Sequence, residues 1–313
     1  MTNSAGLPHQ PVLLTETLAG LNPQPAGCYL DATFGRGGHA AAILAALGPE
    51  GRLLALDRDP AAEHWARTRF GGDPRFTFAR SAFGQLGKVV AERGLAGRLD
   101  GVLFDLGVSS PQFDDPARGF SFSRNGPLDM RMDPNTGIAA AEWLARVKEV
   151  ELERVLAEWG EERFHRRIAR ALVAARQRIP ITTTAQLAEL IAAAVPTREP
   201  GQHPATRAFQ AIRIAVNDEL GELRVALPQA VWALAPSGRL AAISFHSLED
   251  RVVKRFMRDQ ARGREWPPDL PVQGEPEGMT LRLVGRAVRP SAAEIAANPR
   301  ARSAVLRVAE RRP

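Results

Sequence analysis

Two acidic residues flank a glycine-rich turn near the beginning of the sequence. Asp31 ends one apolar run, and Gly35, Gly37 and Gly38 follow it. Glycine lets the backbone take positive φ and approach a ligand closely, and a helix that starts here would offer free amide groups. Asp57 ends a second apolar run 20 residues after Gly37, about the distance at which a Rossmann-like unit holds ribose hydroxyls. These residues predict a nucleotide-type cofactor site.

Two kinds of cofactor fit this spacing. The stretch Gly35-x-Gly37-x-x-Ala40 satisfies the G/A variant of the dinucleotide fingerprint, so NAD and a nicotinamide oxidoreductase stay open as an alternative. Asp31 favours S-adenosylmethionine, because a carboxylate suits the positive ammonium group of that ligand and is an awkward neighbour for a pyrophosphate. A purely structural turn is the third interpretation, and Asp57 alone could cap the helix that follows it.

A third acidic residue ends another apolar run. Asp105 closes the run that starts at Leu99, and in a doubly wound sheet ligands bind at the carboxyl ends of the strands. Asp105 is therefore expected beside the cofactor, where it could contact the cofactor or accept a proton or hydrogen bond from an amine substrate. Neutral donors and acceptors follow at Ser109, Ser110 and Gln112. The alternative is a turn that Asp105 and Ser109 stabilise.

A glycine-rich loop downstream combines aromatic, basic and acidic side chains. Arg118, Phe120 and Phe122 precede a second group that contains Asp129 and Arg131. Such side chains could stack on a flipped base and hydrogen-bond to it. They could equally form an ordered loop with internal ion pairs.

A basic helix is predicted around residues 159–174. Its arginines recur at i, i+3, i+4 and i+7 and so share one face: Arg163, Arg166, Arg167 and Arg170. This face could bind RNA phosphates. It could also be a solvated face whose arginines pair with Glu161 and Glu162.

The elements that must position these residues alternate between strand and helix. Apolar runs at 52–56, 75–83, 99–106 and 239–245, with helical patterns between them, predict a mostly parallel, doubly wound α/β sheet. The alternation breaks between Phe113 and Ile212, where helices are predicted at 139–144, 150–174, 184–194 and 205–220. We therefore expect a core of residues 1–112 and 213–313 and a helical insertion of residues 113–212 that recognises the substrate. The runs 280–284 and 304–309 could form a terminal antiparallel pair.

Composition narrows the class of protein. The chain has 313 residues and one cysteine, Cys28, so an internal disulfide is excluded. Residues 1–10 lack the basic and apolar regions of a signal peptide, and no apolar run reaches the roughly 20 residues that span a bilayer, so a cytoplasmic protein is expected. The six histidines show no metal-ligand spacing, and no metal is predicted.

Charge is distributed unevenly along the chain. Residues 1–115 hold 10 Lys+Arg against 12 Asp+Glu, whereas residues 116–313 hold 31 against 23. A basic remainder attached to a cofactor-binding start favours an anionic macromolecular substrate. Arginine outnumbers lysine 38 to 3, which a GC-rich genome would also produce. The uneven charge is therefore a weaker indication of an anionic substrate than the motifs are of a cofactor site.

Several of these motifs together resemble one family. The runs that carry the resemblance span nearly the whole chain: His9 to Leu14, Asp31 to His39, Asp57 to Pro60, Asp105 to Gln112, Gly119 to Asp133, His203 to Gln210, Ser244 to Arg251 and Asn298 to Arg307. They closely resemble the bacterial ribosomal RNA small-subunit methyltransferase H family. The resemblance implies a class I, Rossmann-like S-adenosylmethionine methyltransferase fold with a helical insertion. It also implies methylation of the exocyclic N4 amine of a cytidine in the decoding centre of 16S rRNA, with the small ribosomal subunit as partner.

The resemblance also assigns site residues. The implied cofactor contacts are Gly37, Gly38, His39, Asp57, Phe83, Asp105 and Gln112. Asp105 is the expected catalytic residue, assisted by the backbone carbonyls of residues 106–109, although Asp105-Leu106-Gly107-Val108 departs from the Asp/Asn-Pro-Pro-aromatic motif of many amine methyltransferases. An RNA-binding ribosome assembly factor with a vestigial cofactor fold is the alternative from a different functional class.

Overall fold

The computed structural model describes residues 11–197, 201, 203–263 and 278–313, so His9 and Gln10 lie outside the described residues. The chain divides into two compact units. The first unit is Met1–Gly107 with Leu220–Pro313, and the second unit is Val108–Glu219. The insertion expected at residues 113–212 lies within the second unit, which extends further at both ends.

The first unit is built on one twisted sheet. Over the described residues its strands are β1 (Cys28–Asp31), β2 (Arg52–Asp57), β3 (Phe76–Arg80), β4 (Leu99–Asp105), β5 (Leu234–Ser244), β6 (Leu281–Leu283) and β7 (Val305–Arg311). Their order is β3-β2-β1-β4-β5-β7-β6. The first five strands pair in parallel, and β7 runs antiparallel to both β5 and β6. This confirms the doubly wound sheet and the terminal antiparallel pair.

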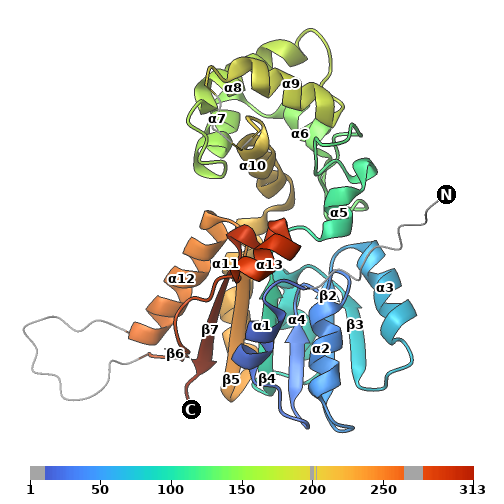
Figure 1. The fold of residues 1–313 in the computed structure, drawn as a ribbon, viewed down its shortest axis with the longest axis vertical. Helices are drawn as coiled ribbons and strands as arrows, with labels where there is room; N and C mark the ends of the chain where they lie inside the picture. Colours follow the sequence, from blue (N-terminus) through green and yellow to red (C-terminus); the bar gives the residue numbers. More distant parts are fainter. Residues whose placement is uncertain (1–10, 198–200, 202, 264–277) are drawn as a thin grey trace, which may run out of the picture. The chain divides into compact units, whose positions relative to one another are not determined.

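Helices cover both faces of this sheet (Figure 1). They are α1 (Leu14–Leu21), α2 (Gly38–Ala46), α3 (Pro60–Phe70), α4 (Leu86–Glu92), α11 (Glu219–Ala233), α12 (Ser247–Arg262) and α13 (Ala292–Ala297), with the short 3-10 helices η1 (Phe83–Gln85) and η3 (Pro299–Ser303). Strand side chains alternate between the faces. On β1, Tyr29 packs in the core beneath α1, α2 and α3, whereas Leu30 packs in the core beneath α4, α11 and α12.

The second unit is helical. It contains α5 (Ser110–Asp114), η2 (Pro116–Arg118), α6 (Ala140–Arg146), α7 (Glu149–Glu158), α8 (His165–Arg176), α9 (Thr184–Ala194) and α10 (Thr206–Asn217). The apolar faces of these helices share one core, which includes Leu152, Ile168 and Ile212. Across the described parts of the whole chain, no helix is both long enough and apolar enough to cross a membrane.

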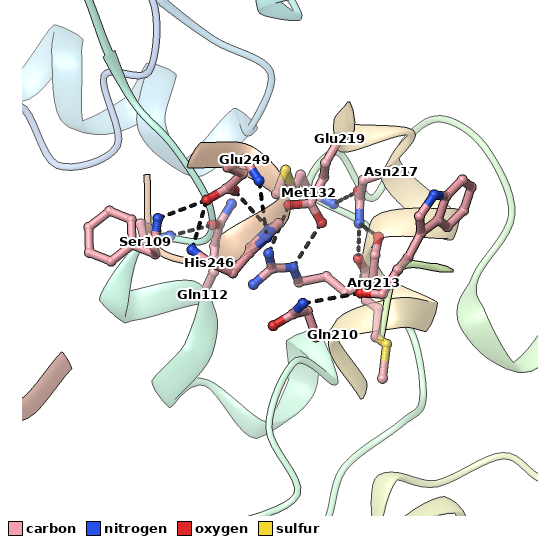
Figure 2. A network of polar contacts seen from close by, with 12 residues as sticks. Ser109, Gln112, Met132, Gln210, Arg213, Asn217, Glu219, His246 and Glu249 are labelled. Carbon is pink, nitrogen blue, oxygen red and sulfur yellow. Dashed lines mark hydrogen bonds and ion pairs between the residues drawn. The ribbon is translucent and has the colours of Figure 1, made fainter. Parts of the chain in front are cut away.

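One buried amide joins a loop of the second unit to α10. Asn217 donates a hydrogen bond to the carbonyl of Met130 at 2.7 Å and accepts one from the amide of Met132 at 2.7 Å. Figure 2 shows this contact with Met132 and the neighbouring two-point ion pair between Arg213 and Glu219, at 2.8 and 2.9 Å. The two bonds of Asn217 satisfy backbone groups that the irregular loop leaves without a ladder partner.

Two helix predictions are wrong in detail. The helix expected at 150–174 is interrupted, because α7 ends at Glu158 and α8 begins at His165. Glu161, between them, has a φ of 48°, which no α-helix accommodates. The helix expected at 205–220 ends at Asn217 for the same reason, since Asp218 has a φ of 49°.

Candidate cofactor site

Three aspartates end three neighbouring strands. Asp57, Asp31 and Asp105 are the last residues of β2, β1 and β4, which lie side by side in that order. Asp31 is in register with Ala55 and Leu103, and Asp57 and Asp105 lie two residues beyond those partners. Because strand side chains repeat every two residues, all three carboxylates leave the sheet on one face, the face that α2 covers.

Burial makes these carboxylates hard to ionise without a cation. It is the largest cause that raises the pKa of Asp105 to about 8, of Asp31 to about 7 and of Asp57 to about 6. The next causes that raise the pKa of Asp105 are the neighbouring carboxylates of Asp31 and Glu249. A site of this kind favours a positively charged ligand and disfavours a phosphate, because a cation lowers the cost of ionising all of them.

Thr33 joins the ends of two of these strands. The Asp31 Oδ1 atom accepts a hydrogen bond from the Thr33 amide at 3.1 Å, and the Thr33 hydroxyl accepts one from the Asp105 amide at 2.6 Å. The position of Asp105 relative to Asp31 is therefore fixed by hydrogen bonds as well as by the sheet. The sequence interpretation missed Thr33, although a short polar side chain directly after a strand-ending acid is a readable signal.

Asp57 holds the glycine-rich turn. Its Oδ2 atom accepts a hydrogen bond from the Gly35 amide at 2.8 Å, and its Oδ1 atom accepts one from the Asp59 amide at 2.9 Å. The alternative role of Asp57 as a helix cap is wrong, because Asp59 caps α3 by accepting from the Ala61 amide at 2.9 Å. Each carboxylate oxygen has a second lone pair, so Asp57 can still accept from a ligand's hydroxyl groups.

His39 and Asp105 present polar atoms that the described protein does not satisfy. The His39 side chain is 5% exposed, and its Nε2 atom lies 3.6 Å from the Asp105 Oδ2 atom, outside hydrogen-bond distance. The Asp105 Oδ1 atom is buried and has no hydrogen-bond partner among the described residues. The buried ring nitrogens of His39 make no hydrogen bond of good geometry there either, although burial, which lowers the pKa of the imidazole, is partly opposed by the nearby backbone of Val12, which raises it. Buried polar groups are nearly always satisfied in a working protein, so these atoms fit a polar ligand.

The glycines of the turn are required by the protein's own packing. Gly37 has a φ of 70°, and a Cβ atom there would lie 2.6 Å from the Phe34 ring. A Cβ atom on Gly38 would overlap the Pro11 ring. These glycines therefore let the N-terminal end of α2 pack closely, where its first amides have no partner within the helix.

Phe83 lies in the turn that follows β3, the strand beside β2. The Ser81 amide donates to the carbonyl of Asp57 at 2.9 Å, so this turn starts next to the Asp57 backbone. The half-buried Phe83 ring meets the Phe104 ring edge to face at 5.9 Å. The ring packs against the core beneath α4, α11 and α12, on the face of the sheet opposite to α2, and the turn that carries it starts at the carboxyl end of β3.

Gln112 belongs to the second unit, unlike the other six expected cofactor contacts. Its side chain is 8% exposed, and its Oε1 atom accepts a hydrogen bond from the Ser109 amide at 2.9 Å (Figure 2). Gln112 therefore stabilises the first turn of α5. The first unit brings together Gly37, Gly38, His39, Asp57, Phe83 and Asp105.

Glu249 is a buried acid that the sequence interpretation did not single out. It is 2% exposed and accepts hydrogen bonds from the amides of Phe245 at 2.8 Å and His246 at 3.3 Å. Its Oε1 atom lies 3.1 Å from His246 Nε2 (Figure 2). His246 in turn caps α12, so this pair shapes the turn after β5 and adds negative charge near Asp105.

The expected basic face is only partly helical. Arg163 precedes α8 and lies 5.4 Å over the Phe164 ring, so the regular spacing holds only from Arg166 onward. Arg166 pairs with Glu153 at 2.9 Å instead of with Glu161 or Glu162. The side chains of Arg167 and Arg170 are exposed and make no hydrogen bond or ion pair with any residue that the structure describes.

In the aromatic and charged loop of the second unit, the arginine side chains bond to other groups of the same loop. Arg131 forms a two-point bond with Asp129 at 2.9 and 2.7 Å, and Arg118 donates to the carbonyls of Arg131 and Met132. The Phe120 side chain is 4% exposed. The alternative of an ordered loop with internal ion pairs is confirmed.

The chain matches one protein family over nearly its full length. The MraW methylase family matches residues 6–312. The ribosomal RNA small subunit methyltransferase H of Thioalkalivibrio sulfidiphilus is 63% identical over 304 residues, which cover 97% of each chain. Proteins of the same name from Thiobacillus denitrificans and Nitrosococcus oceani are 62% and 58% identical and cover 97% and 99% of both chains. The chain therefore belongs to the MraW methylase family and is an S-adenosylmethionine-dependent methyltransferase, as the resemblance implied.

Proposed function

We propose that this protein methylates the exocyclic N4 amine of a cytidine in the decoding centre of 16S rRNA, within the small ribosomal subunit. Its relatives carry the name ribosomal RNA small subunit methyltransferase H, which supports rRNA as the substrate. The single observation that carries the proposal is the row of three carboxylates at the ends of β2, β1 and β4. A row of three acids fits a cationic cofactor and an amine substrate, whereas the pyrophosphate of NAD would be repelled.

The cofactor would lie along this edge of the sheet. Asp31 and Asp105, at the ends of β1 and β4, would stabilise the positive ammonium and sulfonium groups. Asp57 would accept hydrogen bonds from the ribose hydroxyls. Phe83, beyond Asp57 on the β3 side, offers a ring for the adenine. His39, at the first turn of α2, adds buried ring nitrogens that make no hydrogen bond of good geometry with a described residue. The proposed cofactor contacts are Gly37, Gly38, His39, Asp57, Phe83, Asp105 and Gln112.

Asp105 is the proposed proton acceptor. S-adenosylmethionine supplies an electrophilic methyl group on a sulfonium. The exocyclic amine of cytosine is a weak nucleophile, because its lone pair is delocalised into the ring. An Asp105 carboxylate that accepts an N–H hydrogen bond would localise that lone pair, and afterwards it would take the proton that the nitrogen loses. In the ligand-free protein the pKa of Asp105 is raised to about 8, mainly by burial, and a bound cation would favour the ionised form that can accept a proton.

Asp105 and its neighbours would act mainly through positioning. The Thr33 hydroxyl fixes the backbone of Asp105, and the carbonyls of residues 106–109 are further acceptors for amine hydrogens. Holding an acceptor nitrogen in line with a methyl donor replaces a bimolecular encounter with an oriented one. Arg163, Arg166, Arg167 and Arg170 are the proposed contacts to rRNA phosphates.

The test is methyl transfer to small-subunit particles that lack the modification. Particles are incubated with the protein and S-adenosylmethionine that carries a deuterated methyl group, and the digested rRNA is analysed by mass spectrometry. The proposal expects labelled N4-methylcytidine at one cytidine of the decoding centre. Label on carbon 5 or on a ribose oxygen would reject the amine chemistry. Binding of particles without any transfer would favour the assembly-factor alternative.

A further inference from the structure

Side chains of α11 bind three backbone groups in the turn of residues 83–87, which comprises η1, with Phe83, and the first residues of α4. The Gly84 amide donates to Glu222 Oε2 at 2.8 Å, and the Gly87 amide donates to Gln229 Oε1 at 2.5 Å. Gln229 Nε2 also donates to the carbonyl of Gly84 at 3.0 Å. One helix therefore hydrogen-bonds the turn at two points, Gly84 and Gly87.

These side chains belong to a well-anchored helix. Glu222 and Gln229 are seven residues apart, so they lie on the same side of α11 two turns from each other. Leu223, Ala226 and Leu227 are buried in the core between α11 and the sheet. The core residues of α11 cannot shift without disrupting their packing. The helix therefore holds the turn that it hydrogen-bonds in a fixed position.

The turn can approach α11 only because two of its residues lack a side chain. A Cβ atom on Gly84 would overlap Glu222 Oε2, and one on Gly87 would lie 2.9 Å from Gln229 Oε1. Neither position leaves room for a Cβ atom unless the α11 side chain moves. The two glycines and the two polar side chains thus form one matched contact.

Glu222 also connects this turn to the residue after Asp57. The Glu222 Oε2 atom lies 3.3 Å from Arg58 Nη2, and both side chains are largely shielded from solvent, at 24% and 19% exposure. The Arg58 guanidinium carbon lies 6.0 Å from the centre of the Phe83 ring. One carboxylate therefore holds both the turn of Phe83 and the guanidinium that lies over its ring.

We propose that Glu222 and Gln229 are positioning residues that set the affinity of the protein for the adenosine half of its cofactor. This inference rests on the proposed placement of Phe83 at the adenine and Asp57 at the ribose. Neither α11 residue touches the cofactor itself. They act by holding Phe83 and the β3 turn at the spacing from Asp57 that an adenosine requires.

The test measures binding of two ligands by isothermal titration. S-adenosylhomocysteine contains both halves of the cofactor, and 5′-methylthioadenosine contains the adenosine half alone. Glu222→Ala and Gln229→Ala should each raise Kd for both ligands by about tenfold, which corresponds to about 1.4 kcal/mol. In methyl transfer, KM for S-adenosylmethionine should rise by a similar factor, while kcat at saturation stays within about twofold of wild type.

Matched variants separate positioning from folding. Arg224→Gln changes an exposed residue of the same helix and should leave every ligand affinity unchanged. Glu222→Gln keeps an acceptor for the Gly84 amide and should restore most of the affinity. Gly84→Ala should push Glu222 aside and resemble Glu222→Ala, and the double variant should be no weaker than either single variant, because both remove one contact.

Two results would overturn the inference. One is wild-type affinity for both ligands in folded Glu222→Ala and Gln229→Ala proteins. The other is a weakening confined to S-adenosylhomocysteine, which would place the effect at the amino-acid half. Failure of the proposed function has a different signature, because the deuterated methyl group would then appear on another atom or on no nucleoside, whatever the ligand affinities of the α11 variants are. Melting temperatures of all variants identify any that fail to fold, and if the α11 variants do, Gly84→Ala still tests the inference, because it displaces the Glu222 side chain without changing α11.

Discussion

The Nε2 atom of His39 lies 3.6 Å from the Oδ2 atom of Asp105, and the pKa values of the two groups are shifted in opposite directions. Burial lowers the pKa of His39 to about 4 and raises that of Asp105 to about 8. At pH 7 the imidazole is therefore neutral and much of the carboxyl group keeps its proton. The ligand-free site is largely uncharged at this point, and a cationic ligand would change that.

Asp105 should destabilise the ligand-free protein as pH rises. In the unfolded chain this carboxyl ionises near its ordinary pKa of 3.8, whereas in the folded protein it keeps its proton to about pH 8. Between these values the folded state binds more protons, so unfolding becomes easier as pH increases. Asp105→Asn removes this contribution. Thermal unfolding between pH 4 and pH 8.5 should show wild type losing stability relative to the variant.

The same Asp105→Asn variant should lose most of its methyl-transfer activity, because the amide preserves shape but cannot accept a proton. Parallel melting curves for variant and wild type at all pH values would show that Asp105 ionises normally. Wild-type single-turnover rates in the variant would remove Asp105 from the chemistry. The two measurements are independent, so each can contradict its own prediction, the raised pKa of Asp105 or its part in methyl transfer, without affecting the other.

Cofactor binding should release protons. A cation near Asp31 and Asp105 favours their ionised forms and so lowers their pKa values from about 7 and about 8. Affinity for S-adenosylmethionine should therefore rise with pH from 6 to 8 and level off above it. Titration calorimetry in buffers of different ionisation enthalpy measures the protons released. Equal heats in all buffers, together with a pH-independent affinity, would contradict the prediction.

Asp57 should matter to the ribose end of the cofactor. Asp57→Asn cannot offer two full acceptor oxygens, and a hydrogen bond to a charged acceptor contributes about 1.5 to 3 kcal/mol. Kd for S-adenosylhomocysteine should therefore rise about 10- to 100-fold, as measured by isothermal titration. Glu50→Gln, which removes an exposed carboxylate, is the control for net charge. Unchanged affinity in folded Asp57→Asn protein would reject the ribose role.

The sequence predicted the row of acids because its signal is local. Asp31, Asp57 and Asp105 each end an apolar run, and parallel strands bring such ends together at one edge. Glu222 and Gln229 gave no comparable signal, since their partners in the Phe83 turn lie 138 to 145 residues away. Contacts of that length depend on the packing of the completed sheet and cannot be read from spacing.

The helix breaks at Glu161 and Asp218 were missed for a different reason. Both are non-glycine residues with positive φ, a conformation that costs energy locally and is selected here by tertiary packing. The helical pattern of the sequence predicted continuous helices through them. The break changes the prediction of RNA binding, because Arg163 precedes α8 and does not lie on the regular helical face that was expected to bind phosphates.

Arg167 and Arg170 now give the sharpest test of RNA binding by the second unit. Both side chains are exposed on α8, and neither pairs with a described residue, so a bound phosphate would not need to displace a carboxylate. Changing both to Gln should weaken binding to small-subunit particles and leave S-adenosylhomocysteine affinity intact. The slope of log affinity against log salt should become shallower by up to about 0.7 to 0.9 for each phosphate that is no longer neutralised.

The control for this experiment is a double variant with the same change in net charge. Arg146 and Arg154 lie in the same unit, but each is already paired, with Glu142 and with Glu151 and Glu158 respectively. Arg146→Gln with Arg154→Gln should therefore change the salt slope less than the α8 pair does. Equal slopes for both double variants would mean that binding responds only to net charge. Wild-type affinity and slope in the α8 variant would show a solvated face, and the basic residues of α12, Lys254, Arg255, Arg258 and Arg262, would be the next to test.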